Sequence, residues 1–190
     1  MSETVLELPG YAEIEALEDR DGLRYEMWNG ELVAMTGGSS AHNLIALGLR
    51  DVIRPQVRPC LVYVADMALK LQPGSYSDKA YPDTMLVCEP SAGNHQTNPL
   101  LVAEVLSDSS VKRDRNEKMR AYQALASVET YLIVSQTALH IEAYRRNHGW
   151  SREDFIGAEA VIELSKPNLT IALCDVYADV LALGVLGPVE

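Results

Sequence analysis

Hydrophobic residues along the chain recur with two periods, one typical of strands and one typical of helices. Asn29-Gly30 stands between two strand-like runs, 25–28 and 31–35, and this dipeptide is the strongest local signal for a β-hairpin. Helical spacing predicts helices at 12–19, 41–54, 112–125 and 174–183, and apolar runs predict strands at 60–71, 82–88, 100–106, 129–134 and 139–145, with a closing strand pair within 150–163. The pattern therefore predicts a single α/β domain over 1–190, with a mixed central sheet, flanking helices and an N-terminal hairpin.

The net charge of the chain limits how it can bind a nucleic acid. The 190 residues include 16 Lys and Arg against 27 Asp and Glu, which gives a formal net charge of −11. A field of this sign repels phosphate, so a nucleic-acid partner requires a local basic patch or a bound cation.

The chain shows neither a targeting signal nor a disulfide framework. It begins without a basic segment, and no apolar run approaches the ~20 residues that cross a bilayer, so we expect a cytoplasmic protein that does not bind membranes. The cysteines, Cys60, Cys88 and Cys174, are odd in number and widely spaced. We expect them to be buried, unpaired thiols in a reducing compartment.

Two carboxylates occupy positions that are unusual for surface residues. Asp83 follows Pro82 at the start of a predicted strand, and Glu104 lies in the middle of the apolar run 100–106. Period-2 alternation gives Glu104 the same face as Leu100, Val102 and Leu106, where an unpaired charge is costly. Asp83 alone fits a turn residue after proline, and Glu104 alone fits a buried ion pair with Lys118 or an arginine; together, on neighbouring strands, they favour a divalent-cation site.

The helix predicted at 112–125 brings positive charge next to this pair. Asp114, Lys118 and Tyr122 have i, i+4, i+8 spacing and form one stripe, which places Lys118 at the packed face. Basic residues are concentrated over 112–120, namely Lys112, Arg113, Arg115, Lys118 and Arg120. The alternative is a solvated basic face, but beside the two carboxylates the cluster predicts an electropositive rim that binds phosphodiesters.

The order of these motifs resembles the Uma-type putative restriction endonuclease family of the PD-(D/E)XK nuclease superfamily. The resemblance rests on the hairpin with Asn-Gly-Glu, a helix beginning Ala-His-Asn, Pro-Asp, Glu-Val-Leu-Ser, Asp-x-x-x-Lys-x-x-x-Tyr and Glu-Thr-Tyr-Leu-Ile-Val, and it covers a nuclease-like core of about 25–144. It implies a restriction-endonuclease-like fold.

The resemblance also assigns residues. It implies that Asp83 and Glu104 bind the metal, with the backbone carbonyl of Val105 as a further ligand. Leu106 stands where the superfamily has its lysine, and the family supplies that lysine from the next helix, at Lys118. Further polar positions of the family correspond to His42 and Glu31. The chain departs from the family pattern at Asp108 and Ser135, which are not metal positions.

These residues predict a metal-dependent endonuclease that uses Mg²⁺ or Mn²⁺ to hydrolyse DNA. The predicted catalytic residues are Asp83, Glu104, Lys118 and His42, and the predicted substrate-binding residues are Glu31, Lys112, Arg113, Arg115 and Tyr122. A nuclease that cuts both strands commonly needs two sites, and Trp28 and Trp150 offer apolar surface, so we expect a homodimer.

Two alternatives stay open at this point. One is an inactive nucleic-acid-binding or structural protein on the nuclease fold, in which Glu104 only forms an ion pair with Lys118. The other is a metal-dependent phosphatase. His95 lies in the polar run 91–98, where we expect a solvated loop.

Overall fold

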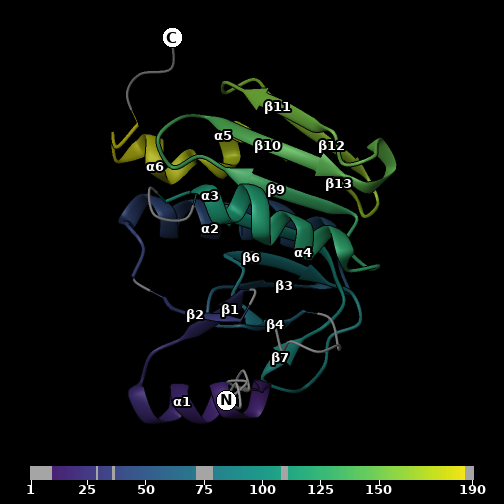
Figure 1. Cartoon of the computed structure of the whole chain (residues 1–190). Coiled ribbons are helices and arrows are strands. Elements are labelled where there is room, and N and C mark those ends of the chain that lie inside the picture. The colour runs from purple at the N-terminus through teal and green to yellow at the C-terminus, as the bar shows by residue number, and fades with distance from the viewer. Residues whose placement is uncertain (1–9, 29, 36, 72–78, 108–110, 187–190) are drawn as a thin grey trace, which may run out of the picture.

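A computed structural model describes residues 10–28, 30–35, 37–71, 79–107 and 111–186 and shows a central sheet covered by helices on both faces (Figure 1). The central sheet has six strands in the order β11-β10-β9-β8-β6-β3. These are β3 (Leu61–Val64), β6 (Thr84–Val87), β8 (Pro99–Val105), β9 (Thr130–Val134), β10 (His140–Arg145) and β11 (Arg152–Ile156). Strands β8 and β9 run parallel and the other neighbours antiparallel, so the sheet is mixed, as predicted.

Strand β8 separates two hydrophobic clusters because its side chains alternate between the two faces of the sheet. Leu101, Ala103 and Val105 face one cluster, and Val102 faces the other. Glu104 shares the face of Val102 and is 3% exposed, which confirms the burial expected from the alternation.

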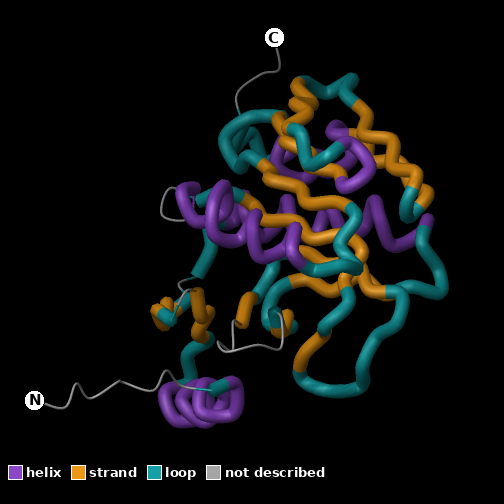
Figure 2. The backbone as a smooth tube through the Cα atoms, turned by 45° about the vertical axis from the view of Figure 1, so that its right-hand side comes forward, coloured by secondary structure: helices purple, strands orange, loops and turns teal. Residues whose placement is uncertain are grey.

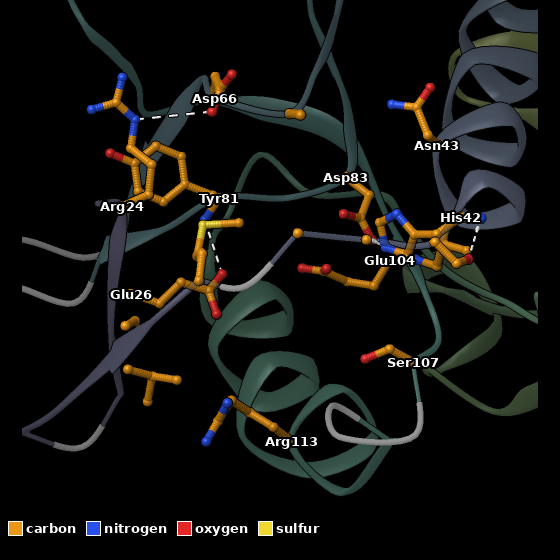
Figure 3. A pocket seen from close by; sticks show the side chains of 18 of the residues that line it. Arg24, Glu26, His42, Asn43, Asp66, Tyr81, Asp83, Glu104, Ser107 and Arg113 are labelled. Carbon is orange, nitrogen blue, oxygen red and sulfur yellow. Dashed lines mark hydrogen bonds and ion pairs between the residues drawn. The ribbon is translucent and has the colours of Figure 1, made fainter. Parts of the chain in front are cut away.

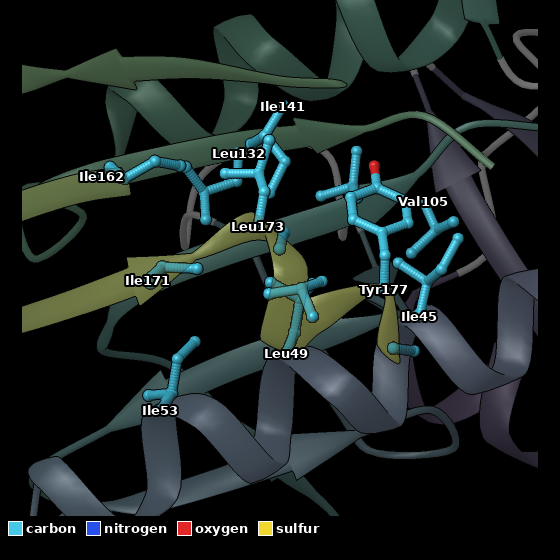
Figure 4. Close-up of a cluster of buried hydrophobic side chains, with 14 of the residues drawn as sticks. Ile45, Leu49, Ile53, Val105, Leu132, Ile141, Ile162, Ile171, Leu173 and Tyr177 are labelled. Atoms are coloured by element: carbon cyan, nitrogen blue, oxygen red, sulfur yellow. The ribbon is translucent and has the colours of Figure 1, made fainter. Parts of the chain in front are cut away.

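The first of these clusters lies under helix α2 (Ser40–Ile53), whose apolar residues pack against the odd positions of β8 (Figure 4). The helix begins where the Ser39 side chain accepts a hydrogen bond from the His42 backbone N–H, which is a normal N-cap. Two short C-terminal helices, α5 (Leu173–Val176) and α6 (Ala178–Ala182), pack on α2. The predicted C-terminal helix is therefore present as two pieces.

The opposite face carries the second helical layer, which is continuous from 111 to 124 but not regular. It consists of α3 (Val111–Arg113), the π-helical turn η2 (Asp114–Lys118) and α4 (Met119–Ala124). A π-helical turn inside a longer helix is rare and often occurs at a functional site.

A second, five-stranded sheet lies beside these layers, in the order β2-β1-β5-β4-β7 (Figure 2). Its members are the predicted hairpin β1 (Tyr25–Trp28) and β2 (Glu31–Ala34), with β4 (Ala68–Lys70), β5 (Lys79–Ala80) and β7 (His95–Gln96). Helix α1 (Tyr11–Asp21) is fastened to it by a buried ion pair, 2.6 Å long, between Glu18 and Lys79.

Several predicted elements differ from those observed. The run 60–71 is not one strand, because Ala65 and Asp66 adopt positive φ (30° and 51°) and the chain leaves β3 to enter β4 in the other sheet. The predicted loop at 91–98 contains β7, which pairs with β4. In place of one closing strand pair, β11 joins the central sheet, while β12 (Val161–Ser165) and β13 (Asn168–Ala172) form a separate ribbon.

The expectation of unpaired, buried cysteines is wrong. Cys60 and Cys88 form a disulfide although 28 residues separate them. The register of β3 and β6 explains the pairing, because Leu61 lies opposite Val87 and the adjoining positions therefore meet. Cys174 is a free cysteine but is exposed.

The apolar surface invoked for a dimer is only partly available. Trp28 is 3% exposed and belongs to the second cluster, whereas Trp150 is half-buried beside Arg146.

Among the helices of the described residues, none has both the length and the apolar character that crossing a bilayer requires.

Candidate active site

Asp83 and Glu104 line the same pocket, which has a volume of about 760 Å³ (Figure 3). Asp83 stands immediately before β6, and Glu104 lies on β8, the neighbour of β6 in the sheet. The backbone N–H of Val105 donates a hydrogen bond of 2.7 Å to Asp83 Oδ2, which fixes the two strand ends to each other. The structure therefore brings the two predicted carboxylates together at the adjoining ends of two interior strands of the central sheet.

Glu104 is held in a fixed position by two neighbours from the helical layer. The Tyr122 hydroxyl donates to Oε1 at 2.6 Å, and Lys118 Nζ lies 3.0 Å from Oε2. Burial raises the pKa of the Glu104 carboxyl well above its usual range; the Lys118 ammonium opposes this rise, and the nearby carboxylates add to it. A positive charge in front of Glu104 would favour its ionised form.

Lys118, the last residue of the π-helical turn, is 5% exposed and lies among three carboxylates. Its Nζ is 3.0 Å from Glu104, 3.2 Å from Glu26 and 3.5 Å from Asp114. Burial lowers the pKa of this ammonium, but the carboxylates raise it by more, so the net shift is upward and Lys118 is a cation at neutral pH.

Glu26 is a site residue that the sequence reasoning missed. It lies on β1, is 5% exposed, and accepts hydrogen bonds from the Trp28 indole (3.0 Å) and the Tyr81 backbone N–H (3.0 Å). The signal was available, because Glu26 interrupts a short strand of large apolar residues in the same way that Glu104 interrupts its own. Its contact with Lys118 links the N-terminal hairpin to the helical layer.

His42 reaches the pocket from the first turn of α2. Its Nε2 lies 3.1 Å from Asp83 Oδ2, and this contact raises the pKa of the imidazole above its usual value against the opposing effect of burial. The ring packs closely on Gly38, where a Cβ atom would lie 2.8 Å from Nδ1. Glycine at this position is therefore what allows the imidazole to point at Asp83.

The predicted substrate-binding residues divide into those that reach the pocket and those that do not. Arg113 lines it, together with Arg24, which the sequence reasoning did not select. Tyr122 is fully buried, so it contacts Glu104 rather than a substrate. Arg115 turns toward β10, where it pairs with the buried carboxylate of Glu142.

Glu31 is exposed on the hairpin, and the pocket lining given by the described residues does not contain it. It lies opposite Trp28 in the β1–β2 register, directly after the turn at Gly30. The side chain of Lys112 is outside the described part of the chain, so its predicted role stays a prediction, and the departure at Asp108 is likewise outside it.

A second group of possible metal ligands lies on the far strands of the central sheet. His140, Glu142 and Asp154 bring one ligand atom each within 4.8 Å of the others. Arg152 lies 3.4 Å from Glu142 and 2.6 Å from Asp154, and Arg115 also pairs with Glu142. Arginines thus contact the carboxylates of this group directly, whereas the cation that contacts Glu104 is Lys118.

Comparison with known proteins agrees with this architecture. The family Uma2, described as a putative restriction endonuclease, matches residues 11–174. Two uncharacterised proteins of Synechocystis sp. (strain ATCC 27184 / PCC 6803 / Kazusa) are similar: sll1609 is 30% identical over 164 residues (81% of this chain, 91% of that protein), and slr1290 is 28% identical over 165 residues (84% and 86%).

A solved structure shares the fold. The crystal structure of a putative nuclease belonging to DUF820 from Anabaena variabilis superposes with a TM-score of 0.65 at 13% identity, covering 82% of this chain and 90% of that one. Together with the mixed sheet and its two helical layers, this confirms the predicted restriction-endonuclease-like fold.

Proposed function

Since the chain belongs to the Uma2 family of putative restriction endonucleases, we propose that it is an endonuclease that hydrolyses phosphodiester bonds in DNA with Mg²⁺ or Mn²⁺ as cofactor. The observation that carries the proposal is an excess of negative charge at the inner end of the pocket. Four carboxylates, those of Glu26, Asp83, Glu104 and Asp114, surround one ammonium, that of Lys118. Even a protonated His42 leaves this group negative, and a divalent cation is what balances such a group.

The donor set fits a hard cation. Asp83 and Glu104 offer carboxylate oxygens from adjoining strands, and both Val105 N–H and His42 contact Asp83 through Oδ2. We assign Asp83, Glu104 and the Val105 carbonyl as the groups that would hold the ion. A divalent ion at this position would supply Lewis acidity for the attack of water on phosphorus.

The remaining side chains have separate roles in the proposal. Lys118 orients the attacking water or stabilises the charge that develops on the phosphate oxygens, as a positioned cation does in a water-poor site. Glu26 is a positioning residue that holds the Lys118 ammonium from the side of the hairpin. His42, whose imidazole carries a proton more readily than usual, holds the phosphate or delivers a proton.

The ion pair between Glu104 and Lys118 is also what an inactive nuclease-like protein would contain. A structural ion pair requires one carboxylate, however, and unbalanced buried charge weakens a fold. The three further carboxylates around the pair bring more negative charge than Lys118 alone can balance, and this favours a site that binds a cation.

The test uses circular DNA. A circle has no ends, so an enzyme that degrades DNA only from its ends cannot cut it. Purified protein is incubated with a supercoiled plasmid and with a circular single strand, in Mn²⁺ or in EDTA. We expect cleavage only with the metal, and its loss in Glu104→Gln, which keeps the shape of the side chain and removes the charge. Glu129→Gln, which removes a carboxylate paired with the exposed Lys166, is the matched control and should cleave normally.

Cleavage that survives in Glu104→Gln would come from another site or another protein. Metal-dependent hydrolysis of a generic phosphate monoester without cleavage of either circle would favour a phosphatase. Absence of both activities from a protein that binds Mn²⁺ would favour a binding role.

A homodimer and a cytoplasmic location remain part of the proposal. Because Trp28 is buried, the dimer rests on the need for two sites to cut two strands. Light scattering at the assay concentration that gives a mass near 20.9 kDa, the mass of one chain, would contradict it.

A further inference from the structure

The acidic residues of the pocket are deeply recessed, which restricts the DNA that can reach them. The side chains of Glu104 and Lys118 are 4% and 7% exposed, and that of Asp83 is 13% exposed. A cavity of about 760 Å³ has the size of a small-ligand pocket, roughly 300–1,000 Å³. A phosphate within a base-paired helix is held on the outside of a stiff rod, whereas an unpaired nucleotide can enter a recess of this kind.

Two arginines with accessible side chains line the same pocket. Arg24 is 47% exposed and Arg113 is 30% exposed, and Figure 3 shows them approaching from different elements, with Glu26 between them in this view. Each guanidinium is 3.9 Å from its carboxylate partner, Asp66 or Glu117, which is longer than a hydrogen bond. Both arginines can therefore turn their donors toward phosphate.

This is a small number of phosphate contacts. A protein that binds duplex DNA strongly through its backbone can make about 6–10 such contacts, and the net charge of −11 opposes any wider electrostatic footprint. Two arginines are enough to contact the phosphates on either side of one nucleotide.

Apolar side chains complete the lining on the side of the hairpin. Leu23, Val33 and Met35 contribute to it, and Leu23 is 46% exposed. An unpaired base has two exposed faces that can pack against apolar side chains. The bases of a duplex already stack on each other.

We propose that the substrate of this site is unpaired DNA, a single strand or a single-stranded flap, with one nucleotide inside the pocket. Its base lies against Leu23, Val33 and Met35, and its flanking phosphates bind Arg24 and Arg113. The proposal rests on the nuclease function proposed above and specifies its substrate class; cutting one unpaired strand needs one active site, so the proposal does not depend on the homodimer.

Cleavage rates provide the first test. One fluorescent oligonucleotide is presented to the full-length protein in Mn²⁺ as a single strand, as a blunt duplex and as a flap attached to a duplex. We expect the single strand and the flap to be cut at least about tenfold faster than the blunt duplex. Equal rates on all three would overturn the proposal and leave the nuclease function standing, whereas cleavage of none would contradict the nuclease function itself.

Binding provides a second test that does not depend on turnover. Fluorescence anisotropy of a short labelled oligothymidylate in EDTA should give a salt slope of about −1.4, from ~0.7 for each of two phosphates on a single strand. Arg24→Gln should halve that slope and weaken binding by about tenfold. Leu23→Ser, at an exposed position, should weaken oligothymidylate binding without changing the unfolding transition.

The matched control is Arg20→Gln, because Arg20 is exposed on α1 and pairs with Asp21. It should leave affinity and salt slope unchanged. Tighter binding of a blunt duplex than of the oligothymidylate, or equal effects of Arg20→Gln and Arg24→Gln, would overturn the proposal.

Discussion

Replacement of Lys118 by methionine separates the catalytic role proposed for this lysine from its structural one. The change removes the ammonium that lies 3.0–3.5 Å from three carboxylates while keeping most of the side-chain volume. Removing one partner of a buried ion pair typically costs about 3–5 kcal/mol, so the metal-free variant should be less stable by that amount. If the lysine also acts on the water or the phosphate, turnover in the folded variant should fall by about 10²- to 10⁴-fold.

The matched control is Lys79→Met. Lys79 is 1% exposed and pairs with the buried Glu18 at 2.6 Å, but it belongs to the contact between α1 and the small sheet. We expect a comparable loss of stability in urea unfolding and normal turnover at a temperature where both variants are folded. Lys118→Arg, which keeps the charge, should recover stability better than turnover.

The affinity of Lys118→Met for the metal should change in a definite direction. Because Lys118→Met removes a positive charge from the site, the variant should bind Mn²⁺ at least as tightly as the wild type. Normal turnover in Lys118→Met, or an equal loss of turnover in Lys79→Met, would show that the lysine has no part in the reaction.

Three other outcomes are expected. Gly38→Ala places a Cβ atom 2.8 Å from His42 Nδ1, so turnover should fall to the level of His42→Ala while thermal stability changes little. Gly48→Ala directs a Cβ atom to 2.2 Å from the Val176 carbonyl oxygen, and overpacking of this kind should lower the free energy of unfolding by about 1–3 kcal/mol in chemical denaturation. In the metal-free protein the pKa of His42, followed by NMR, should be raised, and Asp83→Asn should move it downward because the contact with Asp83 is the main cause of the rise.

The parts of the site that could be predicted from the sequence are those governed by periodicity. Strand alternation gave Glu104 a buried face, and helical spacing placed Lys118 on the packed side of its helix. Both placements agree with the structure, in which the two charges meet at 3.0 Å. The spacing did not reveal the π-helical turn at Asp114–Lys118, because its residues follow the same pattern as an ordinary helix.

The parts that were missed depend on contacts between distant segments. Glu26 lies in a strand too short to show a period, and its role appears only when the hairpin meets the helix that carries Lys118. The break after β3 occurs at Ala65 and Asp66, where neither glycine nor proline marks the positive φ angles. The disulfide depends on the register of two strands, which the spacing of the cysteines does not indicate.

The most direct test of the account is calorimetric titration of the metal-free protein with Mn²⁺. We expect one site per chain, an affinity at least about tenfold lower in Asp83→Asn, and an unchanged affinity in Asp154→Asn, which alters the arginine-balanced group on β10 and β11. Bound metal should also raise the free energy of unfolding, by about 2.7 kcal/mol at a concentration of ~100 Kd. Affinity that is lost in Asp154→Asn and kept in Asp83→Asn would place the metal at the other group and contradict the metal site proposed at Asp83 and Glu104.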